Sequence, residues 1–323
     1  MKKLFSFFFI SYFIFISTIS AYSSKIIASG ENIGINLNSD YVIIIGSYDL
    51  DGFDILKNTP LALGDKIKSI NGNITRNIND LQNALDSLSD GNVIITYIRD
   101  GHEFTIKTIL PKTDSGYKTG LYVKDNVKGV GTLTFIDPET KIFGALGHEI
   151  VEKTTKSKFD ITDGTIYYSS VTGITKSHDG NPGEKNARSN SMDTYGNVSE
   201  NTSYGVFGTY THEIDNSKLY KVALPSDIHV GDAKILTVIS GDKPMEYDIK
   251  ILRINENSNT KNILFQITDS KLLDRTGGIV QGMSGSPIIQ GEYIVGAVNY
   301  VLVDDTEKGY GIFITNMLNE AEN

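Results

Sequence analysis

Residues 277–301 read GGIVQGMSGSPIIQGEYIVGAVNYV, the stretch of the chain with the strongest indication of fold and chemistry. Two apolar runs flank the string Gly-Met-Ser-Gly-Ser-Pro at residues 282–287, which is typical of two strands joined by a tight loop. Glycine at positive φ lets such a loop turn backbone N–H groups toward an oxyanion beside a serine hydroxyl. The stretch therefore predicts a nucleophile loop, with Ser284 as the attacking residue, the amides of Gly282 and Ser284 as the oxyanion hole, and Ser286 as the second choice of nucleophile.

The hexapeptide at residues 282–287 also resembles the nucleophile loop of chymotrypsin-like serine peptidases, Gly-Asp-Ser-Gly-Gly-Pro. Around it, many short β-like runs follow Pro111, broken by Gly, Asn and Asp, while helical signals stand only near Ser270–Leu273 and Asn316–Ala321. The polar stretch Lys176–Ser203 predicts a long surface loop. We expect residues 112–323 to form a mainly β, chymotrypsin-like serine peptidase domain of the double β-barrel type.

A serine nucleophile needs a base, and the candidates are the five histidines His102, His148, His178, His212 and His229. His148 follows a small-residue strand end in FGALGHEIV, residues 143–151, and precedes the serine as in chymotrypsin-like peptidases. The other four stand in turns, polar loops or strand-like surroundings that are typical of surface positions. The residues alone leave open which carboxylate orients the imidazole, the candidates being Asp160, Asp163, Asp269 and Asp274.

Composition limits what can accompany this chemistry. The chain has 323 residues, no Cys, no Trp and a formal net charge of −9. The absence of Cys removes disulfides, thiolate metal sites and cysteine nucleophiles, and no His-x-x-x-His pattern indicates a metal site. An acidic chain without a dense basic stripe is a poor partner for nucleic acid. We therefore expect no cofactor, no metal, no nucleic acid, and a protein as substrate.

Residues 25–111 read as a separate α+β unit. The segment LGDKIKSINGN at residues 63–73 contains turn signals at Gly64-Asp65 and Asn71-Gly72, a helix with one apolar face follows from Asn79, and Asp100-Gly101 predicts a second hairpin. This order resembles a PDZ domain of the bacterial protease-associated kind. The resemblance implies that Ile33, Gly34 and Ile35 form the carboxylate-binding loop of a groove that takes a peptide as an extra strand.

The N-terminus predicts export. Lys2 and Lys3 precede an apolar run from Leu4 to Ile19 and the small residues Ser20 and Ala21, the layout of a signal peptide or a signal anchor over residues 1–24. We expect the remainder of the chain to lie outside the cytoplasm.

Several strings together resemble the stage IV sporulation protein B peptidase family of endospore-forming bacteria: GALGHEI, NPGEK, YGVFG, ITDSKLLDRTGGIVQGMSGSPII and KGYGIFI. The resemblance implies a catalytic triad of Ser284, His148 and Asp269. It also implies export to the space between the forespore and mother-cell membranes and self-cleavage, here between Ser23 and Ser29 or near Tyr41. The family enzyme then cuts a membrane-bound regulator of an intramembrane protease, which processes a pro-sigma factor.

Two other classes of function are compatible with the residues. A non-enzymatic exported scaffold would use the PDZ-like groove to hold a membrane protein. A cell-wall-binding β protein would need an aromatic platform, which the 17 Tyr could supply in the absence of Trp. Labelling by a fluorophosphonate that requires both Ser284 and His148 separates the peptidase from both.

Overall fold

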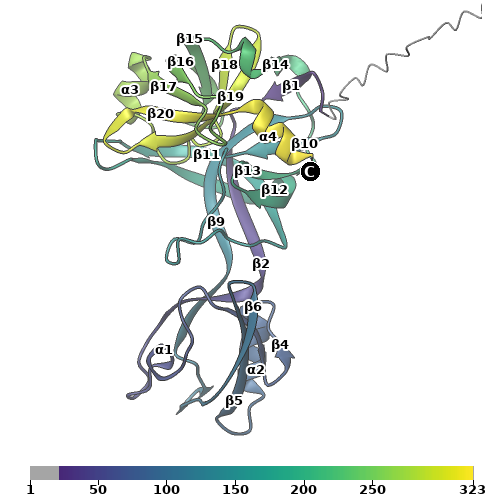
Figure 1. Cartoon of the computed structure of the whole chain (residues 1–323), viewed down its shortest axis with the longest axis vertical. Coiled ribbons are helices and arrows are strands. Elements are labelled where there is room, and N and C mark those ends of the chain that lie inside the picture. The colour runs from purple at the N-terminus through teal and green to yellow at the C-terminus, as the bar shows by residue number, and fades with distance from the viewer. Residues whose placement is uncertain (1–21, 323) are drawn as a thin grey trace, which may run out of the picture.

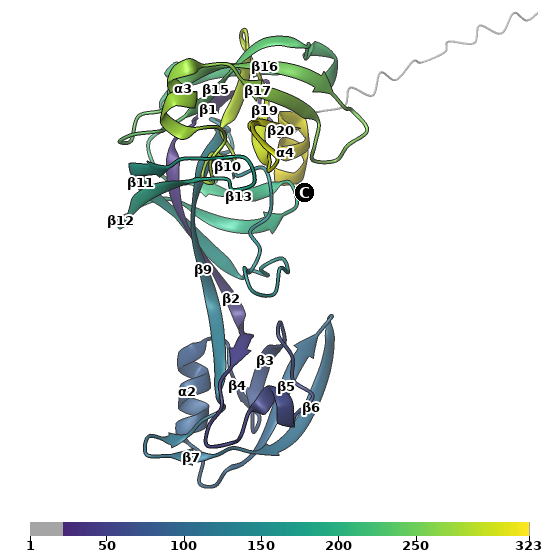
Figure 2. The ribbon, with the colours of Figure 1, turned by 90° about the vertical axis from the view of Figure 1, so that its left-hand side faces the viewer.

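The computed structural model describes residues 22–322, so nearly all of the predicted signal segment lies outside the described residues. Figures 1 and 2 show a larger unit of strands and, below it, a smaller unit connected to it by two long strands that run side by side, β2 (Asn32–Ser47) and β9 (Leu121–Ile136). Within residues 22–322, no helix has the length and apolarity needed to cross a membrane.

A first ring of six antiparallel strands forms half of the larger unit. Pairing runs from β2 to β9, β10, β13, β12 and β11, and from β11 back to β2, so the ring closes. Its core contains Ile33 and Leu37 of β2, Phe143 of β10, and Phe159 of the segment between β10 and β11. The four strands not yet given bounds are β10 (Ile142–Ala145), β11 (Asp163–Thr175), β12 (Glu184–Thr202) and β13 (Gly205–Tyr210).

A second ring forms the other half. Pairing runs from β15 to β16, β17, β20, β19 and β18, and returns to β15. Ile235, Phe265 and Ile288 are among its core residues. Its strands are β15 (Gly231–Thr237), β16 (Met245–Ile254), β17 (Ile263–Ile267), β18 (Pro287–Gln290), β19 (Tyr293–Leu302) and β20 (Asp305–Phe313).

Short elements join the two rings. Strand β14 pairs with β1 on one side and with β19 on the other, and β1 also pairs with β9. A further core of Phe135, Phe207, Ile312 and Met317 includes residues of both rings and of the C-terminal helix. These elements are β1 (Lys25–Ala28), β14 (Leu219–Val222), α3 (Ser270–Thr276), α4 (Ile314–Ala321) and the 3₁₀ turns η1 (Asn216–Lys218) and η2 (Pro225–Asp227); α3 and α4 confirm both predicted helical signals.

The smaller unit has its own core, built from residues between Val42 and Val123. Both predicted hairpin turns are present, with left-handed backbone at Asn71 and Gly72 (φ 50° and 80°) and at Asp100 and Gly101 (φ 50° and 76°). Its elements are α1 (Ile55–Asn58), β3 (Lys66–Ile70), β4 (Asn73–Ile74), α2 (Ile78–Asp86), β5 (Asn92–Arg99), β6 (His102–Ile109), β7 (Lys112–Thr113) and β8 (Gly116–Tyr117).

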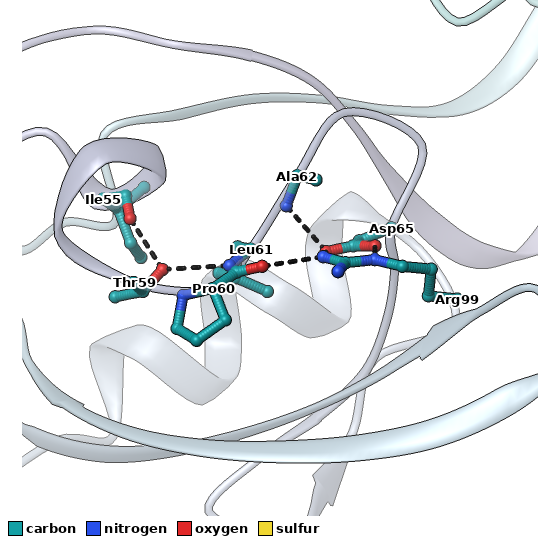
Figure 3. Close-up of polar contacts among 7 residues, drawn as sticks. All are labelled: Ile55, Thr59, Pro60, Leu61, Ala62, Asp65 and Arg99. Carbon is teal, nitrogen blue, oxygen red and sulfur yellow. Dashed lines mark hydrogen bonds and ion pairs between the residues drawn. The ribbon is translucent and has the colours of Figure 1, made fainter.

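The Gly-Asp of LGDKIKSINGN fixes a loop of this smaller unit (Figure 3). Asp65 is 1 % exposed and accepts from Nε and Nη2 of Arg99, both at 2.6 Å, and from the backbone N–H of Ala62 at 2.8 Å. Arg99 Nη2 also donates to the Pro60 carbonyl at 2.7 Å. A bidentate ion pair of this kind holds geometry better than a point contact, so residues 60–65 are fastened to strand β5.

Two sequence-based expectations were wrong about strands. Ile33, Gly34 and Ile35 do not form a peptide-binding loop, because each pairs with β9 on one side and β11 on the other, which leaves no free edge. Ile33 and Ile35 are buried in the first ring instead. The polar stretch Lys176–Ser203 is not mainly a loop, since β12 occupies Glu184–Thr202. Its backbone bonds to β11 do not require apolar side chains where the β11–β12 ribbon is exposed.

The cores divide the chain elsewhere than at the predicted boundary between residues 111 and 112. Strand β1 and the first half of β2 belong to the larger unit, while Leu121 and Val123 pack into the smaller unit. The predicted apolar helix is confirmed, but its N-cap is Asn77 and not Asn79, so it begins two residues earlier than expected; the Asn77 side chain accepts from the Asp80 N–H.

Candidate active site

Ser284 and His148 line the same cavity, which has a volume of about 630 Å³. His148 follows β10 in the first ring, and Ser284 precedes β18 in the second ring. Each ring therefore supplies one of the two side chains, and the cavity lies where the rings meet. Ser286, the second choice of nucleophile, is fully buried and is not part of the cavity lining.

The serine loop is bonded to both rings through its backbone. Gly285 N–H donates to Val298 O at 2.7 Å, and Thr132 N–H donates to Ser284 O at 3.0 Å. Gly285 has φ +92°, and a Cβ built on it would lie 2.2 Å from Thr132 O and 2.5 Å from Leu146 N. Only glycine fits at this position, because it supplies the left-handed backbone and leaves room for the neighbouring chain.

Two peptide planes in this loop are fixed from their carbonyl sides. Gln281 O accepts from the Lys185 N–H at 2.9 Å, and Met283 O accepts from the Ser286 N–H at 2.9 Å. All peptide bonds described are trans, so the N–H groups of Gly282 and Ser284 point away from those carbonyl partners. In the described part of the chain neither N–H donates to any protein acceptor. Both residues line the cavity, so two amides beside the serine are available to a negative charge.

His148 lies against the strand that also contacts the serine. Its ring stacks on Tyr300 with centroids 5.6 Å apart and an interplanar angle of 21°. Ser284 Oγ donates to the carbonyl of the preceding residue, Asn299, at 3.2 Å. Ser284 and His148 thus contact two consecutive residues of β19, Asn299 and Tyr300. Rotation about χ1 of Ser284 is the motion that would redirect its hydroxyl, since catalytic hydrogen bonds often form only with substrate present.

The surroundings of His148 favour a neutral imidazole. Burial lowers its pKa below the ordinary 6.5, and the carbonyl and charge of Glu149 oppose that effect in part. His148 Nδ1 lies 2.8 Å from Glu149 O, a contact that places the proton on Nδ1 when the ring is neutral. Nε2 then has a free lone pair, the form that a general base requires.

The structure does not bring Asp269 to His148. Asp269 is the N-cap of α3, where its Oδ1 accepts from the Leu272 N–H at 2.9 Å and its Oδ2 lies 3.4 Å from the Asp248 N–H. Among residues 22–322, the atom hydrogen-bonded to His148 Nδ1 is the carbonyl oxygen of Glu149. A backbone carbonyl therefore occupies the orienting position that the sequence resemblance gives to Asp269.

No hydrogen bond or ion pair among the described residues joins the other carboxylates considered from sequence to His148. Asp160 pairs with Lys66, Asp163 accepts from Asn38 Nδ2 at 2.6 Å, and Asp274 lies within α3. Among the described histidines, His148 alone lines the cavity. No group of three or more His, Asp or Glu residues within 22–322 could hold a metal ion.

Sequence reasoning missed the residues that support the pair. Asn201 Oδ1 accepts from the Ile150 N–H at 2.8 Å, and its Nδ2 donates to Ile150 O at 2.9 Å and to Phe159 O at 2.8 Å. Thr132 Oγ1 donates to Gly282 O at 2.8 Å. These contacts hold the serine loop and the segment that follows His148. They join residues far apart in the chain, so no local sequence motif predicts them.

Comparison with known families gives one match. The description of the matching family is SpoIVB peptidase S55, and the matched residues are 115–318. No curated protein matches the chain.

Solved structures of a mycobacterial protease show a weak likeness. The chain is similar to the active form of the Rv3671c protease from M. tuberculosis, with 14 % identity over 61 % of this chain and 74 % of that chain and a TM-score of 0.34. It is also similar to an inactive form of the Rv3671c protease, with 13 % identity over 60 % and 85 % of the two chains and a TM-score of 0.32.

Proposed function

Because this chain belongs to the SpoIVB peptidase S55 family, we propose that it is a serine endopeptidase whose catalytic pair is Ser284 and His148. The observation that carries the assignment is the shared cavity: Ser284, His148 and Gly282 line it, and among the described residues the amides of Gly282 and Ser284 donate to no protein acceptor, while the Ser284 hydroxyl donates to Asn299 O. A serine that precedes β18 of the second ring and a histidine that follows β10 of the first ring therefore line one cavity.

The proposed reaction has two halves, acylation of Ser284 and hydrolysis of the acyl ester, and both use these groups. Ser284 Oγ attacks the scissile carbonyl carbon while His148 Nε2 takes the hydroxyl proton, and the oxyanion accepts from the amides of Gly282 and Ser284. The carbon–nitrogen bond breaks as the imidazolium returns the proton to the leaving amine. Water then attacks the acyl ester, with His148 again as base, and Ser284 is regenerated.

Fluorophosphonate labelling of the purified full-length chain tests the assignment. We expect labelling of the wild-type protein and its loss in both Ser284→Ala and His148→Ala. Ser286→Ala is the matched control, since that buried serine belongs to the same loop but not to the cavity lining. Labelling that persists in Ser284→Ala would reject Ser284 as the nucleophile, and a folded wild-type protein that is not labelled would reject the peptidase in favour of a scaffold.

The two rings support a finer proposal about fold. We place the larger unit in the chymotrypsin-like double β-barrel class, because two six-stranded antiparallel rings each contribute one member of the catalytic pair. We propose that the smaller unit is a PDZ domain. Its support is the predicted order of hairpin, helix α2 and second hairpin, together with an independent core.

The cellular role follows as a proposal from the family. We propose export, self-cleavage and cleavage of a membrane-bound regulator during sporulation, which starts intramembrane processing of a pro-sigma factor. Of the self-cleavage positions expected from sequence, we favour the vicinity of Tyr41, where Asp40 is exposed and the pairing of β2 with β9 shifts register between Asn38 and Ile43; between Ser23 and Ser29 only Ser24 and Lys25 are exposed. Ile26 and Ile27 are instead buried in β1.

N-terminal sequencing and mass measurement of wild-type and Ser284→Ala protein test self-cleavage. We expect shorter wild-type products that begin near residue 41, and Ser284→Ala at the precursor mass. Identical fragment patterns for the two proteins would assign the cleavage to another protease.

A further inference from the structure

The catalytic cavity contains a free strand edge. Strands β2 and β1 pair with one side of β9, β2 over residues 121–132, whereas β10 pairs with the other side only from Leu133 to Ile136. In the part of the chain that the structure describes, no strand pairs with that second side between Lys124 and Gly131. Residues 126–130 line the cavity along this edge.

The free edge leads directly to the nucleophile. Thr132 N–H donates to Ser284 O at 3.0 Å, and Thr132 O accepts from the Leu146 N–H at 3.3 Å. Both groups point to the side of β9 away from β2. Backbone groups alternate in direction along a strand, so those of Val130 and Lys128 point the same way as those of Thr132. These groups can form a ladder with an added strand that ends beside Ser284.

The same stretch is locally basic within an acidic chain. Lys124, Lys128 and Lys153 line the cavity, against one carboxylate, Glu149. Lys124 Nζ is already paired with the buried Glu152 at 3.1 Å. Lys128 and Lys153 are exposed, and within residues 22–322 neither makes a salt bridge. Two ammonium groups without a salt-bridge partner in the described structure therefore line the cavity beside the edge on which a peptide can pair, together with the single carboxylate of Glu149.

We propose that protein substrates bind as an extra strand on the β9 edge and that Lys128 and Lys153 select an acidic extended segment; this rests on the proposed peptidase function. Main-chain bonds to β9 supply affinity, and the two lysines discriminate by charge. The edge extends from the serine toward the smaller unit, as the course of β9 in Figures 1 and 2 shows, so the acidic residues lie on the part of the substrate that points to that unit.

The test compares two peptides that share a cleavable centre and differ only in having Glu or Gln at the flanking positions. For the wild-type protein we expect kcat/KM to be about tenfold higher for the Glu peptide at low salt, a difference that added salt reduces and that lies mainly in KM. Lys128→Glu combined with Lys153→Glu should abolish or reverse the preference. The matched control is Lys156→Glu with Lys158→Glu, two exposed lysines of the neighbouring loop that do not line the cavity.

Fluorophosphonate labelling separates this proposal from the proposed function. Equal labelling of wild-type, charge-reversed and control proteins shows that the peptidase assignment stands while the peptide preference is measured. A wild-type preference for Gln over Glu, an unchanged preference in the charge-reversed protein, or an equal loss in the control protein would overturn the docking proposal.

A second inference concerns Lys185, the last residue of the string NPGEK, which the proposed reaction leaves unused. Lys185 is 5 % exposed, and its Nζ donates to Thr237 Oγ1 at 3.0 Å and lies 3.4 Å from Thr132 Oγ1. Both threonines are fully buried. Among the described residues, no carboxylate forms a salt bridge with this amine. A buried lysine without a counter-ion is costly, which calls for an explanation.

Lys185 contacts the serine loop in three ways. Its N–H donates to Gln281 O at 2.9 Å, and its aliphatic stem packs against Gly282, where a Cβ would lie 3.1 Å from Lys185 Cδ. Its amine reaches Thr132 Oγ1, which donates to Gly282 O at 2.8 Å. Lys185 thus contacts the peptide unit before Gly282 directly and the peptide unit after it through Thr132.

The geometry points to Lys185 as a positioning residue for the oxyanion amides: its N–H holds the peptide plane that carries the Gly282 amide, and its amine, through Thr132, holds the Gly282 carbonyl in the next plane. The charge on the amine strengthens the hydrogen bond from Thr132 to Gly282 O by polarising it. Burial alone lowers the pKa of Lys185 to about 7, with no charged group contributing to the shift. The rate should therefore depend on pH near neutrality through protonation of this amine, which a merely structural side chain would not cause.

Kinetics of Lys185→Met test this role, because methionine keeps the apolar stem and removes the amine. We expect kcat to fall about tenfold with KM near the wild-type value. In the wild-type protein kcat should decrease as the pH rises through about 7 and the Lys185 amine loses its proton, and this decrease should be absent from Lys185→Met. The melting temperature should stay level or rise, since an unpaired buried amine is removed. Wild-type kcat and pH profile in folded Lys185→Met would overturn the inference.

Thr132→Val keeps the test valid should Lys185→Met fail to fold. This variant retains the lysine and breaks the connection to Gly282 O, so we expect the same fall in kcat without a rise in KM. An unchanged kcat in Thr132→Val would also overturn the role. Labelling of the wild-type protein, run in parallel, shows separately whether the peptidase assignment holds.

Discussion

The serine loop and the histidine segment are held in different ways. The serine loop is fixed by backbone bonds from Thr132, Lys185 and Val298, and by a glycine whose neighbours leave no room for a side chain. The ring of His148 is held by one contact to the carbonyl of the next residue and by the face of Tyr300. The proposed nucleophile and oxyanion side is therefore preorganised by main chain from both rings, whereas the proposed base depends on local contacts and has no carboxylate partner in the described structure.

The largest effect is expected from a change that breaks the serine side. In Gly285→Ala the new Cβ would lie 2.2 Å from Thr132 O, at a residue with φ +92°. The loop must move, so both oxyanion amides lose their orientation, and we expect fluorophosphonate labelling to slow by at least about 10³-fold. Strain at such a backbone position costs about 1–3 kcal/mol, measurable as a lower free energy of unfolding.

Gly291→Ala is the matched control for this prediction. Gly291 also has a left-handed backbone, with φ +62°, but a Cβ there meets nothing within 4 Å. It should lose a comparable amount of backbone stability while labelling proceeds at the wild-type rate. If Gly285→Ala labels as fast as Gly291→Ala, the serine loop is not fixed in the way described.

These two halves of the site also differ in how far sequence could predict them. The serine loop is contiguous, so its glycines and hydroxyl are legible in one string, and His148 is marked by the small residues before it. Asp269 was harder, because a helix N-cap and a triad acid both require a carboxylate at a strand end. Asn201 and Thr132 act across the fold and have no local signature.

Residues Ile33–Ile35 likewise depend on partners that are distant in sequence. Strand β2 is a single element of 16 residues whose first half pairs in the first ring and whose last residues lie in the smaller unit. An alternating apolar pattern is the same in a groove and in a ring, so it could not show which neighbours would pair with it. Pairing partners distant in sequence decided the outcome.

A smaller effect is expected on the pH dependence of kcat/KM, which reports on the surroundings of His148. The pKa of His148 lies below 6.5 because burial disfavours the imidazolium, and a general base must be neutral. We expect kcat/KM for an uncharged peptide to stay on its plateau below pH 6.5 and to fall only as pH drops through the lowered pKa. Glu149→Gln should move this limb to still lower pH, because the Glu149 charge opposes the shift.

The opposite profile would contradict the description of the base. An acid limb at or above pH 6.5 would show that a carboxylate stabilises the imidazolium, as in a triad. Wild-type and Glu149→Gln proteins measured over one buffer series distinguish the two cases.

The smallest expected effect is that of Asp269→Asn, which tests whether a carboxylate orients His148. Asp269→Asn keeps a side-chain oxygen at the N-cap of α3, where asparagine caps as well as aspartate, so stability should change by a few tenths of a kcal/mol. If a carboxylate at residue 269 oriented His148, the amide would cost about 10⁴ in kcat. The structure directs both Asp269 oxygens to backbone N–H groups instead, so we expect kcat within about twofold of wild type. Asp269→Ala then separates the roles, since it should lower the free energy of unfolding by about 1 kcal/mol and still leave kcat unchanged. A large loss of kcat in folded Asp269→Asn would mean that α3 rearranges to complete a triad when substrate binds, and the histidine side would then be the part of the site that assembles last.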